Sequence, residues 1–473
     1  MTAPTYCLRT ELGTPATTST GHSLLRLLHL SDSHVLDSVS PARCEWLELL
    51  AHDPHWQPLL HMHRPYEALT HWALAAHVER LHRNPLAPHS QLPYDLALST
   101  GDAIDNAQAN ELQAFVTIMG GGRTALSAFG GVHQSGHELG SGDWPFWCPD
   151  SHAPDLWKAQ GYPEVPGFSA RASAELHSPG LGFAWASVPG NHDVMRQGTA
   201  LPNAAIEAIA QGPHKALARP EGFWPEQPQP LFVAQPELFC APGQRQIAAQ
   251  PLRRAVDVRE WMAAHMQHGA VGFGQAQLRS GCADTFIDTE HVRIILLDTN
   301  HPGGDYEGSI GRAQIAWLEE RLAEVAHSGR LAIVASHHGA VSLVNTRGHD
   351  PERQLAQALT AALHRHPCVV AWLVGHRHLH RVQPHPHPQG QGGGFWEITT
   401  ASLIDWPVQT RAVELLRHSD GTLEIVCTLQ DHQAPNGSLA ALHRDLTLRF
   451  AGDQAAGMQG QAQDGNVRLF LRR

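Results

Sequence analysis

The sequence of 473 residues has few lysines, few cysteines and no long apolar run. Neither of its two lysines, Lys158 and Lys215, follows a glycine-rich phosphate-binding loop, which excludes a P-loop nucleotide hydrolase. No G-x-S-x-G motif is present, so the nucleophile elbow of the α/β-hydrolases is also absent. Two large classes of hydrolase are therefore excluded by missing motifs.

The seven cysteines are spread irregularly from Cys7 to Cys427 and include no C-x-x-C pair. This pattern argues against a disulfide framework and against a cysteine-rich zinc site, and it favours reduced thiols in a cytoplasmic protein. No stretch approaches about 18 consecutive apolar residues, and Met1 to Gly21 has no signal-peptide pattern. We expect a soluble, cytoplasmic chain without a membrane partner.

Charged residues make up 16% of the chain, compared with about 25% in an average domain, and the net charge is −12. Proteins that bind nucleic acids usually carry a basic face, so a nucleic acid partner is not expected. Histidine, by contrast, occurs 35 times. Most of these side chains must be ordinary surface or packing residues, and only their position on a predicted element can single out functional ones.

Five short apolar runs predict buried strands, and an Asp, Asn or His follows each of them. In open α/β sheets, the chemistry lies just beyond the carboxyl ends of the strands. We therefore expect these polar side chains to meet in one site, although they are far apart in the sequence. The runs and their polar residues are Leu24 to Leu30 with Asp32 and His34, Tyr94 to Ser99 with Asp102, Phe183 to Val188 with Asn191, His192 and Asp193, Leu331 to Ala335 with His337 and His338, and Val369 to Val374 with His376 and His378.

The motif series D-x-H, G-D-x-x-D, G-N-H-D, H and G-H-x-H resembles that of the calcineurin-like metallophosphoesterase superfamily, in the same order from Asp32 to His378. The chain is also similar to a long-insertion, actinobacterial-type subgroup. The resemblance implies an α/β fold, an α/β/β/α sandwich of two mixed sheets flanked by helices. It also implies a dinuclear metal centre as the cofactor.

By position in the motifs, the resemblance assigns a role to each strand-end residue. His192 would face the leaving-group oxygen as a hydrogen-bond donor or general acid, oriented by Asp193. The two divalent ions could be Mn, Fe, Zn or Co, because Asp, Asn and His ligands accept all of these. The implied ligands are Asp32, His34 and His378 for the first ion, Asn191, His337 and His376 for the second, and Asp102 as the bridge.

The function that follows is hydrolysis of a small or medium phosphate ester by attack of a metal-activated hydroxide. Whether the small-molecule substrate is a monoester or a diester stays open. Cyclic-nucleotide phosphodiesterases and nucleotide pyrophosphatases of the same superfamily are alternatives. A non-catalytic scaffold on the same fold is an alternative of another class, which the intact set of seven ligands disfavours.

We expect residues 1–21 to be a flexible tail, residues 22–430 to form one catalytic domain, and residues 431–473 to pack on the core as an extension. Insertions at about 120–182 and 198–269 interrupt the domain. The first is expected to cap the site, because both of its ends are anchored beside predicted ligands. A peripheral decoration or an oligomer contact is the alternative for this insertion. The residues expected to contact substrate are Arg123, His133, Trp144, Trp147 and Trp157.

We expect mainly structural roles for several further residues. Asp105 or Asn106 is expected to cap a helix from Asp105 to Met119. Asp298 and Asp405 border the predicted site and are expected to be structural, whereas for His338 both a positioning and a packing role are open. The apolar runs Trp396 to Thr400, Val413 to Leu416 and Leu423 to Leu429 predict strands of a second sheet.

Overall fold

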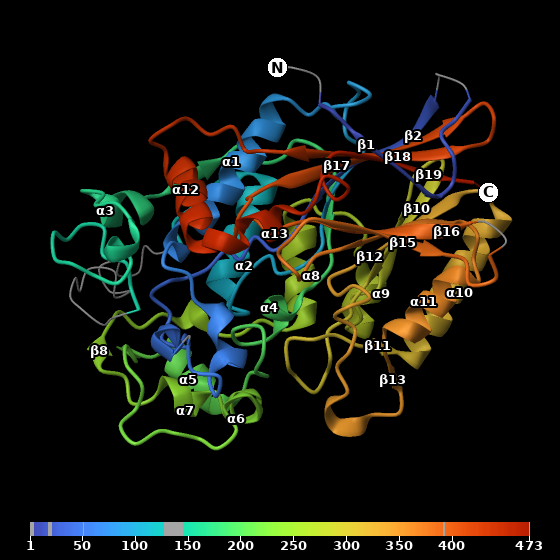
Figure 1. Cartoon of the computed structure of the whole chain (residues 1–473). Coiled ribbons are helices and arrows are strands. Elements are labelled where there is room, and N and C mark those ends of the chain that lie inside the picture. Colours follow the sequence, from blue (N-terminus) through green and yellow to red (C-terminus); the bar gives the residue numbers. More distant parts are fainter. Residues whose placement is uncertain (1–3, 18–20, 51, 127–144, 391–392, 473) are drawn as a thin grey trace.

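The computed structural model describes residues 4–17, 21–50, 52–126, 145–390 and 393–472. Two mixed β-sheets lie face to face at the centre of the molecule (Figure 1). The seven-stranded sheet has the order β1 (Cys7–Leu12), β19 (Val467–Leu471), β18 (Leu423–Gln430), β17 (Thr410–His418), β2 (Gly21–Leu30), β3 (Leu96–Ser99) and β6 (Trp185–Ser187). The six-stranded sheet has the order β15 (Arg381–Pro386), β16 (Gly394–Thr399), β14 (Val369–Val374), β12 (Leu331–Ser336), β10 (Val292–Leu297) and β9 (Thr285–Asp288).

Apolar side chains fill the space between the two sheets. Leu25 and Leu27 of β2 and Ile294 and Leu296 of β10 are fully buried members of this core. The other faces of the sheets carry buried apolar residues as well, because helices cover them. This arrangement explains why the central strands read as nearly continuous apolar runs rather than as alternating patterns.

Helices cover the outer face of each sheet (Figure 1). The helices α1 (Thr70–Arg83), α2 (Ala109–Gly120) and α8 (Val258–Gln267) share a buried cluster with β2 and β3 of the seven-stranded sheet. The helices α10 (Arg312–His327) and α11 (Ala356–His364) pack on the outer face of the six-stranded sheet. The predicted α/β/β/α sandwich of two mixed sheets is therefore confirmed.

The strands near both termini differ from the expectations. Residues 7–12 are not a loose tail, since β1 pairs in parallel with β19 at the edge of the seven-stranded sheet. An edge strand buries only part of its surface, so the polar sequence of this segment gave no apolar run to detect. The late strands also do not form one sheet, because β16 pairs with β14 while β17 pairs with β2.

The helix expected from Asp105 begins later, at Ala109, with Gln108 as its N-cap residue. Asp105 and Asn106 do not cap it, because their side chains bind residues of the loop after β2. The Asp105 carboxylate bonds with His34, and the Asn106 amide donates to the Ala42 carbonyl at 3.1 Å. Local sequence could not distinguish these long-range bonds from a helix cap.

The second insertion is an ordered layer beside the site. Its helices α5 (Ala204–Gln211), α6 (Pro228–Ala234) and α7 (Glu237–Cys240) pack with residues 42–62 around a buried aromatic cluster that includes Trp46 and Trp56. The buried Lys215 ammonium donates to Glu45 at 2.6 Å and to the Ser38 carbonyl at 2.9 Å. In the same layer the sulfur atoms of Cys44 and Cys240 lie 3.1 Å apart, a proximity that their sequence spacing did not reveal.

The structure describes residues 120–126 and 145–182 of the first insertion, and residues 145–182 lie against the C-terminal segment. Trp147 and Trp157 are buried with Leu439 and Leu446 of α12 (Leu439–Ala451). Arg123 is exposed and pairs with Glu175, so it does not face the site. His133 and Trp144 lie outside the described residues. Among the described helices, none combines the length and apolarity that a membrane crossing requires.

Candidate metal centre

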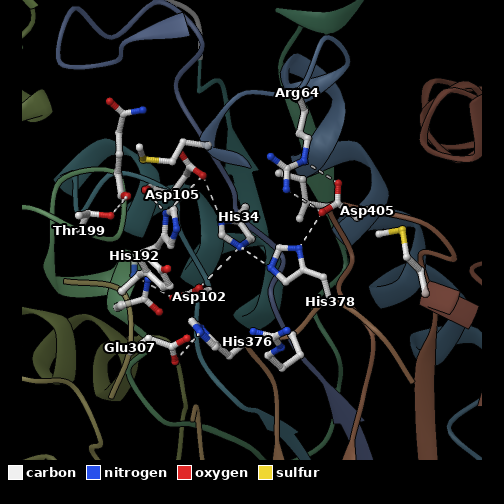
Figure 2. A pocket seen from close by; sticks show the side chains of 17 residues that line it. His34, Arg64, Asp102, Asp105, His192, Thr199, Glu307, His376, His378 and Asp405 are labelled. Carbon is white, nitrogen blue, oxygen red and sulfur yellow. Dashed lines mark hydrogen bonds and ion pairs between the residues drawn. The ribbon is translucent and has the colours of Figure 1, made fainter. Parts of the chain in front are cut away.

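The seven predicted ligands converge at one end of the paired sheets, in the loops that follow β2, β3, β6, β12 and β14. All of them except Asp32 and His337 line a cavity of about 350 Å³ (Figure 2). Five of the seven have a left-handed backbone, which is uncommon for residues other than glycine and tends to occur at functional sites. The five, with positive φ angles, are Asp32, His34, Asp102, His376 and His378.

In the first cluster, hydrogen bonds fix which imidazole nitrogen carries the proton. His34 Nδ1 lies 3.0 Å from Asp105 Oδ1, and His378 Nδ1 lies 2.7 Å from Asp405 Oδ2. Because a carboxylate only accepts, both Nδ1 atoms donate, and in the neutral imidazoles both Nε2 atoms carry lone pairs. These two Nε2 atoms are 3.3 Å apart, and His378 Nε2 is 3.3 Å from Asp32 Oδ1. These acceptor atoms, His34 Nε2, His378 Nε2 and Asp32 Oδ1, face one another and could together coordinate a cation.

In the second cluster, formed by Asn191, His337 and His376, side-chain atoms also face one another. His337 Nδ1 donates to the Thr100 carbonyl at 2.7 Å, so in the neutral imidazole its Nε2 carries a lone pair. The Asn191 amide NH2 donates to the Gly198 carbonyl at 2.9 Å, which turns the Asn191 oxygen toward His337 Nε2 at 3.0 Å. His376 Nδ1 lies 3.2 Å from the same His337 nitrogen. The Asn191 oxygen, His337 Nε2 and His376 Nδ1 therefore face a common point.

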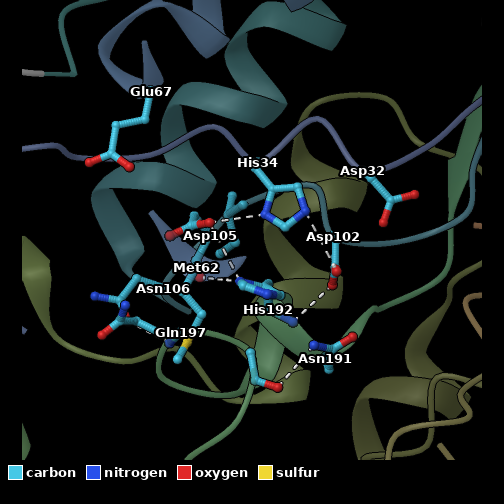
Figure 3. Close-up of polar contacts among 12 residues, drawn as sticks. Asp32, His34, Met62, Glu67, Asp102, Asp105, Asn106, Asn191, His192 and Gln197 are labelled. Carbon is cyan, nitrogen blue, oxygen red and sulfur yellow. Dashed lines mark hydrogen bonds and ion pairs between the residues drawn. The ribbon is translucent and has the colours of Figure 1, made fainter. Parts of the chain in front are cut away.

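Asp102 lies between the two clusters (Figure 3). Its Oδ2 is 3.1 Å from His337 Nε2 and 3.7 Å from His34 Nε2, while its Oδ1 accepts the backbone N–H of His192 at 2.8 Å. The glycine of the G-N-H-D motif is needed for this approach, since a Cβ at Gly190 would lie 2.2 Å from Asp102 Oδ1. One carboxylate therefore reaches both groups of acceptors.

Electrostatics make the centre attractive to positive charge. Burial alone would lower the pKa values of His337 and His378, but the neighbouring Asp102 and Asp32 raise them to about 9 and about 10. Burial would raise the pKa of Asp102, and the adjacent His337 and His192 instead hold it well below its usual range. The carboxylates are therefore ionised, and protons on the imidazoles compete with any metal ion for the same lone pairs.

His192 lines the cavity beside His34, but Asp193 does not orient it as expected. The His192 Nδ1–H donates to the Asp105 carbonyl at 2.6 Å. The Asp193 carboxylate instead accepts backbone N–H groups of Ala103, at 3.1 Å, and Gly190, at 2.7 Å, and so ties two ligand loops together. Both residues lie in the short helix α4 (Asn191–Val194), where side chains at i and i+1 do not face each other.

Two carboxylates and their arginines complete the site. Asp105 and Asp405, expected to be structural, hold the Nδ1 atoms of His34 and His378, and such outer partners fix the orientation of metal-binding imidazoles. Arg64 donates to both oxygens of Asp405, at 2.7 Å and 2.9 Å. The guanidinium of Arg43 donates to a single oxygen of Asp105, Oδ2. These arginines are far from their partners in sequence, so no local pattern could have identified them.

His338 and Asp298 lie at the edge of the site without entering the cavity. His338 Nδ1 is 2.9 Å from Thr299 Oγ1 and its Nε2 is 3.0 Å from the Tyr306 carbonyl, so both ring nitrogens have protein partners. Asp298 accepts the backbone N–H of Asn300 at 3.0 Å. These contacts hold the loop after β10 against the loop after β12.

Replacing Arg43 by methionine is expected to lower the free energy of unfolding by about 3–5 kcal/mol, because it leaves buried carboxylates without their cation. Arg43 is fully buried, and its guanidinium contacts Asp105 and also Glu67, at 2.8 Å. The matched control is Arg83→Met, which breaks an exposed pair with Glu79 and should cost no more than about 1 kcal/mol. Urea unfolding of the two variants measures the difference, and equal losses would contradict this account of Arg43.

Comparisons with known proteins give two partial similarities. No protein-family model matches the sequence. A curated protein, a probable cyclic nucleotide phosphodiesterase from Synechococcus sp. (strain WH7803), is 33% identical over 90 residues, which are 18% of this chain and 32% of that protein. The match thus spans about a third of the length of the curated relative.

Among solved structures, a dimetal phosphatase from Danio rerio aligns with 87% of this chain and 97% of its own chain. The sequence identity is 11% and the TM-score is 0.41. The order of motifs, the two mixed sheets and the flanking helices are properties of this chain itself. Together these features make an α/β sandwich of two mixed sheets flanked by helices, with insertions.

Proposed function

We propose that the chain is a hydrolase, a metal-dependent phosphoesterase that acts on a small or medium phosphate ester with two divalent ions. The observation that carries the proposal is the set of lone pairs that face one another on both sides of Asp102. Two cations bound there would neutralise the phosphate and activate the attacking water. The proposed ligands are Asp32, His34 and His378 on one side, Asn191, His337 and His376 on the other, and Asp102 between them.

Two other residues of the chain would act on the substrate, and a third would position side chains of the site. Arg377 is exposed and lines the cavity, where its charge would attract a phosphate anion. His192, held through Nδ1 by the Asp105 carbonyl, would donate a hydrogen bond or a proton to the leaving-group oxygen. Asp105 would keep both His34 and His192 in place.

The finer activity is open between phosphatase and phosphodiesterase. The sequence similarity to a protein named as a probable cyclic nucleotide phosphodiesterase favours cyclic nucleotides as one substrate class to examine. That similarity covers a small share of both chains. It therefore supports phosphodiesterase activity as a candidate without deciding between phosphatase and phosphodiesterase.

The proposal is tested by stripping metals with a chelator and restoring Mn, Fe, Zn or Co separately. Each preparation is assayed on a panel of phosphomonoesters, phosphodiesters and cyclic nucleotides. We expect no hydrolysis by the stripped protein and recovery with at least one metal, at two ions per chain. Hydrolysis that is indifferent to chelation would contradict the proposal. Metal-loaded protein that cleaves no ester of the panel would favour the non-catalytic scaffold.

A further inference from the structure

A second cavity, of about 880 Å³, adjoins the metal centre. It shares Arg64, Asp405 and Met458 with the cavity that five of the predicted metal ligands line. Arg64 and Asp405 lie beside His378, on the side of His34 that faces away from Thr199 (Figure 2). These shared residues form the boundary between the two cavities, and a ligand whose phosphate lies among the predicted metal ligands would pass them to enter the second cavity.

Three segments that are distant in sequence form the walls of this adjoining cavity. They are the segment before α1, the described part of the first insertion, and the C-terminal segment. None of the described residues 145–182 lines the metal cavity itself, so this part of the insertion is not the cap expected over the metal ligands. The wall residues are Glu48, Leu49, His52 and Gln57, then Leu156, Trp157 and Gln160, and then Phe450, Ala451, Gln454 and Met458.

The apolar part of the wall suits a flat group. The rings of Trp157 and Phe450 are 5.7 Å apart at an interplanar angle of 39°. The Trp157 indole N–H donates to the Pro145 carbonyl at 2.7 Å, which fixes the orientation of the ring. Leu49 and Leu156 are 40% and 39% exposed, which is high for leucine and leaves apolar surface for a ligand to cover.

The charges on the wall disfavour a second anionic group. The Arg64 guanidinium is neutralised by the bidentate pair with Asp405. Glu48 adds a carboxyl, and burial raises its pKa, as expected for an acid group with little contact with water. Of the remaining polar residues, Gln57, Gln160 and Gln454 are neutral amides that can bond with donors and acceptors alike, and His52 is an imidazole.

We propose that the adjoining cavity binds the uncharged, ring-bearing organic part of a phosphoester whose phosphate lies at the metal ligands. This inference rests on the proposed function and narrows its substrate class. A volume of about 880 Å³ lies within the range of roughly 300–1,000 Å³ that is common for ligand pockets. The first insertion then contributes to substrate selection through Trp157, beside the metal centre rather than above it.

Non-hydrolysable phosphonates test the proposal on protein reconstituted with the metal that best restores hydrolysis. Calorimetry compares methylphosphonate, naphthylmethylphosphonate and 3-phosphonopropionate, which differ only in the group attached to the phosphonate. Because burial of an aromatic group is strongly favourable, the naphthyl compound should bind at least about tenfold more tightly than the methyl compound. The anionic 3-phosphonopropionate should bind no more tightly than methylphosphonate.

A matched pair of variants locates the effect. Gln454→Trp places a large side chain at the cavity wall, whereas Gln459→Trp places the same side chain at an exposed position of α13 (Ala455–Gln459) that does not line the cavity. We expect Gln454→Trp to abolish the preference for the naphthyl group and Gln459→Trp to keep it. Both variants should bind methylphosphonate as the unmodified protein does.

The possible failures are distinguishable. If the metal-loaded protein binds no phosphonate and hydrolyses no ester, the proposed function fails. If methylphosphonate binds but the naphthyl group adds nothing, or if Gln454→Trp keeps the preference, the proposal for the adjoining cavity is overturned while the proposed function stands. If 3-phosphonopropionate instead binds more tightly than methylphosphonate, the claim that the organic part of the ligand is uncharged is overturned.

Discussion

Asp102→Asn is expected to remove at least one of the two bound metal ions and to abolish hydrolysis while the fold survives. The Asp102 carboxylate is within reach of both acceptor clusters, 3.1 Å from His337 Nε2 and 3.7 Å from His34 Nε2. Without its charge, the repulsion between two divalent ions is no longer compensated. The loss of activity should exceed the roughly 10–100-fold that removal of an outer partner of a metal ligand costs.

The measurements are the metal content of the purified variant, its turnover and its thermal unfolding. Asp298→Asn is a matched control, because Asp298 also follows a central strand but does not line the metal cavity. The control should keep both ions and full turnover. An Asp102→Asn protein with two ions per chain and normal turnover would show that the bridging role is wrong.

His192→Ala is expected to keep both metal ions but to slow the hydrolysis of esters with poor leaving groups by about 10²–10⁴-fold. The His192 ring is anchored through Nδ1 to the Asp105 carbonyl, and it lines the cavity. A nitrophenolate leaving group needs little protonation, so a nitrophenyl ester should be affected much less.

The comparison requires kcat on an alkyl ester and on a nitrophenyl ester, together with the metal content of the variant. A large loss on the alkyl ester and a small one on the nitrophenyl ester would support proton donation by His192. Equal losses on both esters would leave His192 with a role in positioning or binding only. Loss of metal would instead make His192 part of the metal centre.

The sequence was most informative where the polar residues of the site directly follow a strand in the chain. Val369 to Val374 is a strand with the predicted bounds, and His376 and His378 follow it into the cavity. Such signals are local. A strand that is buried on both faces must be an apolar run, and the residues of the turn directly after it are the ones exposed at the end of the sheet. Five signals of this kind carried the family resemblance that implied the fold and the candidate ligands.

The sequence was least informative where a residue acts through a distant partner. Arg43 bonds with Asp105, 62 positions away, and Arg64 bonds with Asp405, 341 positions away. Asp105 was expected to cap a helix because aspartate before a helix often does so, and only the folded chain shows that its carboxylate holds His34. The edge strand β1 was missed for a related reason, since its pairing with β19 joins opposite ends of the chain.

The most direct test of the central claim is anomalous diffraction from crystals of the manganese-loaded protein. The account predicts two anomalous peaks at full occupancy, one beside Asp32, His34 and His378 and the other beside Asn191, His337 and His376, with Asp102 between them. A single peak, or none, at saturating manganese would contradict the claim that these facing acceptors hold two metal ions.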